Sequence, residues 1–220
     1  NPDGTEDTCG NGLRCAAVYL RERRIHPGDE MTFESREGFH HARMLQGEAG
    51  PTIRINMGRP SLKPADIPAT LDVAEVVDYP LVVGSETHRV TGVQIGTPHA
   101  VIFAPWDSVW PTIPTSSPAI ETHSAFPDRV SVTWCSVESP DCLRIRTWER
   151  GVGPTLGCGT GACSALVAAN LAGLAGEAAW VSSPGGILRI EWPGREEVFM
   201  TGGARLVYKG EWRTTAGVME

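Results

Sequence analysis

Two short stretches of the chain repeat one another: Cys9-Gly-Asn-Gly-Leu-Arg-Cys-Ala-Ala-Val and Cys158-Gly-Thr-Gly-Ala-Cys-Ser-Ala-Leu-Val. Each reads Cys-Gly-x-Gly and continues into an apolar, alanine-rich segment with high helix propensity, and the two copies start 149 residues apart. A single such motif is common as a buried cysteine ahead of a glycine-rich helix cap. Finding it twice predicts two related halves, each with a cysteine just ahead of a helix N-terminus.

The position ahead of a helix has chemical consequences for both cysteines. Unpaired backbone N–H groups and the helix dipole at such a terminus stabilise anions. We therefore expect a lowered thiol pKa at Cys9 and Cys158, and a site for a substrate carboxylate at the same N–H groups. If the repeats face one another, two thiols flank one carboxylate-binding cleft. This arrangement suits moving a proton from one face of an α-carbon to the other.

The composition argues against nucleic acid and membrane partners. The net charge is −7 and the sequence has no basic stripe, which argues against a surface that binds nucleic acid. No apolar run approaches the roughly 20 residues that are needed to span a bilayer. The six cysteines include no Cys-x-x-Cys pair, which disfavours zinc. A chain of 220 residues can also build a core without a disulfide framework. We expect a cytoplasmic protein with free thiols and no bound metal.

Lysine is nearly absent from the chain. Amino-acid racemisation usually recruits pyridoxal phosphate through a lysine Schiff base. This sequence has only Lys63, in a proline-rich turn, and Lys209, near the C-terminus, against 17 arginines. Neither lysine is a promising anchor, so we expect chemistry that uses no cofactor.

Hydrophobic periodicity predicts a strand-rich chain with one main helix in each half. The helices are expected at residues 13–24 and 160–172. Strands are expected at residues 31–35, 42–45, 52–57, 79–83, 88–94, 100–103, 130–137, 143–148, 178–181, 187–192, 198–200 and 204–208. Residues 58–64 are predicted to form a linker. Residues 105–118 are predicted to form a connecting segment that can contain a short helix. The order is not a βαβ alternation, so two related α+β halves are favoured over a parallel Rossmann-type sheet.

Two further features are candidates for the site. A Glu-Arg pair is usually a solvated or structural ion pair, but Glu149-Arg150 lies just ahead of the second cysteine loop. There, Arg150 could bind a carboxylate bidentately and Glu149 an ammonium group. His99 lies in a Gly/Pro loop beside an expected strand, where a functional and a structural role are equally open. We interpret His123 as structural.

Taken together, these motifs resemble the diaminopimelate epimerase family over nearly the whole chain. The matching segments are Asn1-Pro2-Asp3-Gly4-Thr5, Cys9-Gly10-Asn11-Gly12-x-Arg14, Met57-Gly58-x-Pro60, Pro98-His99-x-Val101, Phe126-Pro127, Glu149-Arg150-Gly151-x-Gly153, Cys158-Gly159-Thr160-Gly161 and Met200-Thr201-Gly202. The resemblance implies an α+β fold of two pseudo-symmetric domains, each a strongly curved, largely antiparallel sheet around a central helix. It also implies a cofactor-independent isomerase that interconverts LL- and meso-diaminopimelate for lysine and peptidoglycan synthesis.

The resemblance also implies a role for each matching position. Cys9 and Cys158 would be the acid/base pair, one as thiolate and one as thiol. His99 and Glu149 would modulate the pKa values of the thiols. The residues implied to bind substrate are Asn1, Gly10, Asn11, Thr97, Ser131, Glu149, Arg150, Gly159 and Thr160. No metal ligand is implied.

The chain departs from the family pattern where the distal end of diaminopimelate would bind. The family normally has asparagines at the positions of Thr97 and Ser131. The reaction type is therefore expected to hold, while two alternatives stay open: a racemase of another amino acid, or a non-catalytic amino-acid-binding relative. Proline and hydroxyproline racemases usually have histidine where Asn11 stands, and a non-catalytic relative would be expected to lose a cysteine.

The resemblance divides the chain into two domains. Residues 1–62 with 206–220 would form an N-terminal-type domain that carries Cys9, and residues 63–205 a C-terminal domain that carries Cys158. The family opens with strands that would precede Asn1, so the first domain is expected to be incomplete in this chain. The oligomeric state is left open, a homodimer included.

Overall fold

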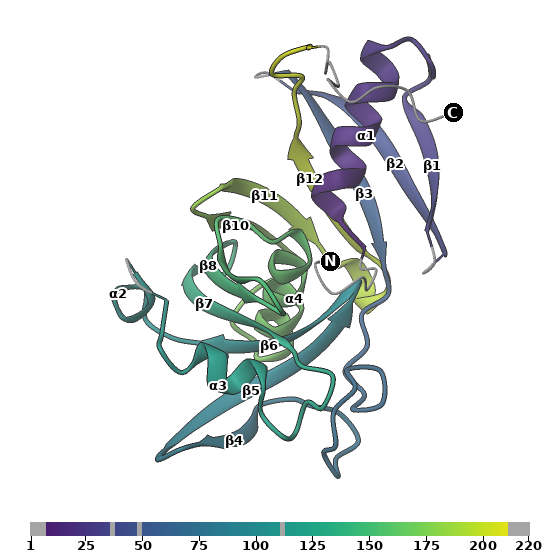
Figure 1. Cartoon of the computed structure of the whole chain (residues 1–220). Coiled ribbons are helices and arrows are strands. Elements are labelled where there is room, and N and C mark those ends of the chain that lie inside the picture. Colours follow the sequence, from purple (N-terminus) through teal and green to yellow (C-terminus); the bar gives the residue numbers. More distant parts are fainter. Residues whose placement is uncertain (1–7, 36–37, 48–49, 111–112, 211–220) are drawn as a thin grey trace, which may run out of the picture.

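Strands dominate the computed structural model, which describes residues 8–35, 38–47, 50–110 and 113–210 (Figure 1). The helices are α1 (Gly10–Glu22), α2 (Trp106–Val109), α3 (Ser117–Glu121) and α4 (Gly159–Leu171), with a 3-10 turn at Pro193–Arg195. The strands are β1 (Glu30–Ser35), β2 (Gly38–Gly47), β3 (Gly50–Gly58), β4 (Tyr79–Val83), β5 (Glu86–Ile95), β6 (Thr97–Phe103), β7 (Ser131–Ser139), β8 (Cys142–Glu149), β9 (Gly153–Thr155), β10 (Ala178–Ser183), β11 (Gly186–Glu191) and β12 (Val198–Gly203). Within these residues, no helix is both long and apolar enough to cross a membrane.

The strands form one continuous, mostly antiparallel sheet. Its order is β1-β2-β3-β12-β11-β10-β8-β7-β6-β5-β4, and β9 also pairs with β8. The two parallel pairings are β6 with β7 and β8 with β10. β12 joins the two halves of the molecule, since Met200 lies opposite Ile55 of β3 on one side and Ile190 of β11 on the other.

Helix α1 lies across the strands of the first half (Figure 1). It contacts β2, β3 and β12. Ala17 and Val18 are buried, while Tyr19 is exposed. Apolar residues on one face and charged residues on the other are typical of a helix that covers one side of a sheet.

Helix α4 is the buried centre of the second half. Every residue from Gly159 to Ala169 is buried, and the sequence of this stretch is glycine, alanine, cysteine, leucine and valine apart from one serine and one threonine. The helix packs against β5 to β8 and β10 to β12. A helix that is apolar on all sides has to be enclosed, and the curved sheet wraps around it (Figure 1).

The first five residues of β7 are buried on both faces of the sheet, and their alternation decides which side chains face α4. Val132 and Trp134 belong to a hydrophobic cluster on the outer side of the sheet, next to α3. Ser131 and Thr133 alternate with them and therefore face the side of α4. Both polar side chains are buried, at 1% and 0% exposure.

The α+β class with a curved sheet around the helices is confirmed, and both main helices begin slightly earlier than expected, at Gly10 and Gly159. Residues 105–118 contain α2 and the start of α3, while residues 111 and 112 lie outside the described part. The strand expected at residues 204–208 is wrong. β12 ends at Gly203, opposite Thr52, and the residues that follow have no regular structure. That segment is β-prone, but a strand also needs a neighbour for its backbone hydrogen bonds.

Candidate active site

Cys9 and Cys158 occupy the same position on the two main helices. Each is the N-cap residue with an extended backbone, at φ −103°, ψ 91° for Cys9 and φ −123°, ψ 116° for Cys158. The Sγ atom of Cys9 accepts a hydrogen bond from the N–H of Gly12 at 3.3 Å, and that of Cys158 from the N–H of Gly161 at 3.4 Å. Sulfur thus takes the place of the oxygen that caps most helices.

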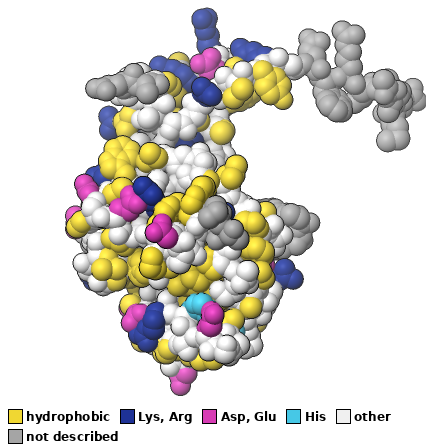
Figure 2. Space-filling view, turned by 90° about the vertical axis from the view of Figure 1, so that its left-hand side faces the viewer, with side chains coloured by type: hydrophobic (Ala, Val, Ile, Leu, Met, Phe, Trp, Pro, Cys, Tyr) yellow, Lys and Arg dark blue, Asp and Glu magenta, His cyan; other side chains and the backbone are white. Residues whose placement is uncertain are grey.

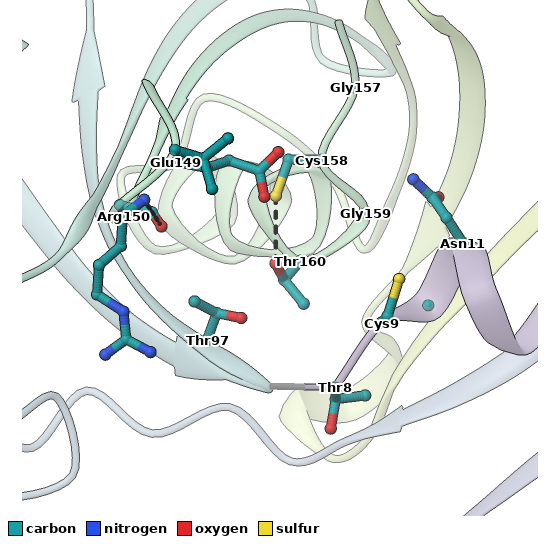
Figure 3. A pocket seen from close by; sticks show the side chains of 13 residues that line it. Thr8, Cys9, Asn11, Thr97, Glu149, Arg150, Gly157, Cys158, Gly159 and Thr160 are labelled. Atoms are coloured by element: carbon teal, nitrogen blue, oxygen red, sulfur yellow. Dashed lines mark hydrogen bonds between the residues drawn. The ribbon is translucent and has the colours of Figure 1, made fainter. Parts of the chain in front are cut away.

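A cavity of about 500 Å³ opens at the N-termini of α1 and α4. It is lined by Thr8, Cys9, Gly10, Asn11, Thr97, Ser131, Glu149, Arg150, Val152, Gly157, Cys158, Gly159 and Thr160. Figure 3 shows Cys9 and Asn11 on one side of the pocket. Glu149 and Arg150 lie on the opposite side, with Cys158 nearer the middle of the view (Figure 3). The structure therefore brings together the predicted site residues of both halves, apart from Asn1 and His99.

Of those two, Asn1 lies outside the described residues. His99 does not line the cavity but lies directly behind its wall, with no exposed surface. Its Nε2 atom is 2.9 Å from Oγ1 of Thr160 and 4.0 Å from Sγ of Cys158. Burial, and secondarily the positive charge of Arg150, lower the pKa of His99 from 6.5 to about 3. The imidazole is therefore neutral at physiological pH.

The two helix termini approach each other around Met200 on β12. A Cβ atom added to Gly159 would lie 3.0 Å from Sδ of Met200 and 3.5 Å from Oδ1 of Asn11. A Cβ atom added to Gly10 would clash with the Met200 methyl group and lie 3.2 Å from Sδ of Met57. The glycine after each cysteine therefore allows both backbones to come close to the same point.

The environment of Cys158 overturns one expectation from the sequence. Burial raises the pKa of this thiol to about 12, and the negative charge of Glu149 adds to the increase. Hydrogen bonds from Thr160 and from the N–H of Gly161 lower the pKa, but by less. A helix N-terminus stabilises a nearby anion by roughly 0.3–1 kcal/mol, which corresponds to a pKa decrease of less than about one unit. Full burial can raise the pKa of an acidic group by about 3–5 units. Desolvation therefore outweighs the helix terminus, and Cys158 is a thiol at neutral pH.

Cys9 lies in a different environment from its counterpart. Its side chain is exposed, whereas Cys158 is 8% exposed. The described cysteines are all free. Within the described part of the chain, no group of three or more His, Cys, Asp or Glu side chains is arranged to hold a metal ion.

Glu149 is the last residue of β8 and Arg150 follows it, both at the cavity wall, and each is held by a neighbour. Oε1 of Glu149 accepts a hydrogen bond from the hydroxyl of Thr155 at 2.5 Å. The backbone N–H of Arg150 donates to Oγ of Ser131 at 3.1 Å, and its Nη1 donates to the carbonyl of Asp128 at 3.4 Å. These contacts keep both charged side chains at the edge of the pocket (Figure 3).

Thr97 and Ser131 begin the parallel strands β6 and β7 and both line the cavity. Thr97 is 9% exposed and Ser131 1% exposed. Because the Ser131 hydroxyl accepts the Arg150 N–H, it already has a partner within the protein. The Thr97 side chain makes no such hydrogen bond within the described residues, so Thr97 is the simpler position for testing specificity.

Three lining residues were not predicted from the sequence: Thr8, Val152 and Gly157. Thr8 and Gly157 directly precede the two cysteines, so their adjacency was a signal that could have identified them. Val152 lies in the loop between β8 and β9, and 57% of its surface is exposed. A single valine between two glycines carries no pattern that would mark it as part of a pocket.

Comparison with solved structures shows that other proteins have this fold. A hydroxyproline epimerase from Agrobacterium vitis superimposes with a TM-score of 0.64 at 16% identity, covering 92% of this chain and 66% of that one, slightly less than two thirds of its length. An epimerase predicted in Pseudomonas aeruginosa gives a TM-score of 0.64 at 17% identity, covering 92% and 73%. This chain therefore shares its fold with these two proteins.

Comparison with sequences shows the family to which this chain belongs. A family model described as diaminopimelate epimerase matches residues 91–207. The diaminopimelate epimerase of Thioalkalivibrio sulfidiphilus is 44% identical over 215 residues, covering 96% of this chain and 75% of that protein. The enzyme of the same name from Pelotomaculum thermopropionicum is 41% identical over 214 residues, covering 96% and 76%. This chain belongs to the diaminopimelate epimerase family, a family of isomerases.

Proposed function

We propose that this protein inverts the α-carbon of LL-diaminopimelate to give meso-diaminopimelate by a two-thiol acid/base mechanism. The single observation that carries the proposal is the placement of two cysteine N-caps, Cys9 and Cys158, in the lining of one cavity. The substrate is inferred from the relatives of about 40% identity that bear the name diaminopimelate epimerase.

The reacting carboxylate would lie between the N-termini of α1 and α4. Gly10 and Gly159, which follow the two cysteines, line the cavity, and the unpaired backbone N–H groups of a helix N-terminus can donate to carboxylate oxygens. Removing the α-proton leaves a carbanion whose charge spreads into the carboxylate. Donors that are already in place stabilise that charge most effectively.

The two thiols would divide the proton transfer between them. A thiolate at Cys9 removes the α-proton from one face, and the Cys158 thiol donates its proton to the other face. The raised pKa of Cys158 supports its entry into this half of the cycle in the protonated form. In the reverse direction the two residues exchange roles. His99, neutral and 4.0 Å from the Cys158 sulfur, would modulate this thiol together with Glu149.

The distal ammonium and carboxylate of diaminopimelate would bind at the far side of the cavity. Glu149 and Arg150 supply the two charges, Thr97 and Ser131 line the wall beside them, and Asn1 would add an amide. The substitution of asparagine by Thr97 and Ser131 favours a second candidate, a racemase of an amino acid that lacks a distal carboxylate. Bridging waters could supply the missing contacts at little cost, so diaminopimelate remains the first candidate.

We also propose that the reaction takes place in the cytoplasm, with no metal or organic cofactor. The two halves would be residues 1–62 with 206–220, and 63–205, with the cavity between them. β12 pairs with β3 of the first half and with β11 of the second. This pairing supports a boundary between the halves close to the end of β12. A homodimer is the proposed assembly.

The test is solvent-proton incorporation by the full-length protein. In deuterated water, LL-diaminopimelate should acquire deuterium at the inverted α-carbon without added pyridoxal phosphate. Cys9→Ala and Cys158→Ala should each abolish net inversion. Cys142→Ala, at a cysteine on β8 that does not line the cavity, is the matched control and should retain activity. Normal turnover by either site variant, or loss of activity on dialysis against EDTA, would contradict the proposal.

A further inference from the structure

A row of buried polar side chains runs beneath the N-terminus of α4, away from the cavity. From the sulfur inward, Oγ1 of Thr160 is 3.3 Å from Sγ of Cys158 and 2.9 Å from Nε2 of His99. On the other side of the ring, Nδ1 of His99 is 3.0 Å from Oγ1 of Thr133, which is 3.4 Å from Oγ1 of Thr147. All of these residues are at most 8% exposed.

The sheet positions the inner part of this row, because His99, Thr133 and Thr147 come from the adjacent strands β6, β7 and β8. Thr133 on β7 lies directly opposite Thr147 on β8, and β7 is also paired with β6, which carries His99. The first turn of α4 rests on the two hydroxyls. A Cβ atom added to Gly161 would lie 3.0 Å from both of them, and 3.3 Å from Cβ of Cys158. The hydroxyl pair therefore supports the same turn that presents the cysteine.

Counting donors shows why Thr133 matters. A neutral imidazole carries one N–H, so one ring nitrogen of His99 donates and the other accepts. If Thr133 donates to Nδ1, then Nε2–H donates to the oxygen of Thr160. The Thr160 hydroxyl proton is then directed at the Cys158 sulfur. In the opposite tautomer, Thr160 has to donate to Nε2, and the sulfur loses this donor.

Thr147 makes the first arrangement self-consistent. When Thr133 donates its proton to His99, its oxygen is available to accept from the Thr147 hydroxyl. Every contact in the row then has one donor and one acceptor, all running toward the sulfur. Such a directed chain of hydrogen bonds strengthens its last donor.

We propose that Thr133 is a positioning residue that holds His99 in the Nε2–H tautomer, so that the Thr160 hydroxyl donates to the Cys158 sulfur when it is a thiolate. This inference rests on the proposed function, in which Cys158 gains and loses a proton in each cycle. Thr133 touches neither the cavity nor the substrate site, and acts only through His99 and Thr160.

The charged groups around the row explain why such a donor is needed. Burial, and then the negative charge of Glu149, disfavours the thiolate of Cys158 by raising its pKa. Burial, and then the positive charge of Arg150, lowers the pKa of His99 and keeps the ring neutral. Behind them, Cys163 is fully buried and faces both Cys158 and the guanidinium of Arg14. Around the sulfur of Cys158, the Thr160 hydroxyl lies at 3.3 Å, the Gly161 N–H at 3.4 Å and Nε2 of His99 at 4.0 Å. Of the two nearest donors, only the hydroxyl can turn away.

The experiment measures Cys158 directly, in full-length protein carrying Cys9→Ala. The rate of alkylation of Cys158 by iodoacetamide is followed at a fixed mildly alkaline pH by peptide mass spectrometry. Thr133→Val should slow the reaction about tenfold, the effect of one lost hydrogen bond to a charged group. Thr133→Ser should restore the rate. Thr91→Val, at a buried threonine whose hydroxyl instead accepts from the Asp78 N–H, is the matched control and should leave the rate unchanged.

Nitrogen NMR supplies a second measurement that a merely structural role would not move. With labelled histidine, His99 should show a protonated Nε2 and a bare Nδ1 at neutral pH, and Thr133→Val should reduce this preference. An unchanged alkylation rate in Thr133→Val, or a protonated Nδ1 in the parent protein, would overturn the proposal. Neither readout needs turnover. A protein that alkylates as expected but fails to invert diaminopimelate would contradict the proposed function and support this one.

Discussion

The sulfur atoms of Cys9 and Cys158 accept hydrogen bonds from the backbone N–H three residues further along, at 3.3 and 3.4 Å. The two cysteines therefore cap their helices in the same way but in different surroundings, since Cys9 is exposed and Cys158 is buried. Burial raises the pKa of the Cys158 thiol to about 12. In the proposed mechanism, which uses one thiolate and one thiol, Cys158 is therefore the residue that starts with the proton.

The first prediction concerns the order in which the two thiols react. At pH 8, iodoacetamide should label Cys9 at least about tenfold faster than Cys158, because the raised pKa of Cys158 leaves little of the reactive thiolate. Peptide mass spectrometry of the timed reaction separates the sites. Cys135, which is also buried and has a pKa raised to about 12, serves as an internal reference for a slow thiol. Equal labelling of Cys9 and Cys158 would contradict the assignment of the proton.

The second prediction concerns oxidation. Both cysteines line the same cavity, and we expect closure of the cleft to bring their sulfur atoms to about 4 Å, near enough to form a disulfide after a small movement. Mild oxidant without substrate should then abolish activity, and dithiothreitol should restore it. Bound substrate should protect the enzyme. Inactivation that persists in reductant, or a mass spectrum with no Cys9–Cys158 linkage, would count against a paired-thiol cleft.

The third prediction concerns stability in acid. The pKa of His99 is about 3 in the folded protein, against 6.5 for an ordinary histidine, so the unfolded state binds the extra proton first. The free energy of unfolding should therefore fall by up to about 1.4 kcal/mol for each pH unit below 6.5. Urea unfolding at pH 7 and pH 5 should differ by about 2 kcal/mol from this residue alone. In His99→Gln, which cannot titrate, this contribution should vanish. An unchanged difference would mean that another group dominates.

The fourth prediction concerns substrate choice. Thr97 and Ser131 offer hydroxyls where an amide would reach further and donate twice. Sites built around polar groups discriminate by up to about 10⁴-fold when those groups are left unpaired. We expect LL-diaminopimelate to react faster than any common L-amino acid in a racemisation screen, and Thr97→Asn/Ser131→Asn to strengthen that preference. Faster turnover of an ordinary amino acid would overturn the substrate assignment.

Single variants separate the contributions of the two positions. Ser131→Asn also removes the oxygen that accepts from the Arg150 N–H, so it should alter the position of this charged side chain as well as the wall. Thr97→Asn changes the wall alone. If the double variant shows no shift in preference, these two positions do not set specificity.

Local patterns were enough to predict most of the elements. The apolar stretch of α4 and the amphipathic stretch of α1 each mark a helix, and the glycine-flanked cysteines mark where the helices begin. The strand expected at residues 204–208 shows the limit of such patterns. Its residues favour extended backbone, but only the sheet decides whether a partner strand lies beside them.

The sequence by itself determined which residue types carry the chemistry. A duplicated Cys-Gly-x-Gly requires that a cysteine precede each helix and that the backbone beside it stay accessible, since both follow from the conformational needs of a helix terminus. Only the tertiary structure decided the properties of these groups. Burial of Cys158 by the sheet raises the pKa of its thiol, whereas the helix terminus alone predicted a lowered pKa. The register of β6, β7 and β8 places Thr133 in contact with His99. Solvation and cross-strand contact depend on residues that are far apart in the chain, and no local pattern records them.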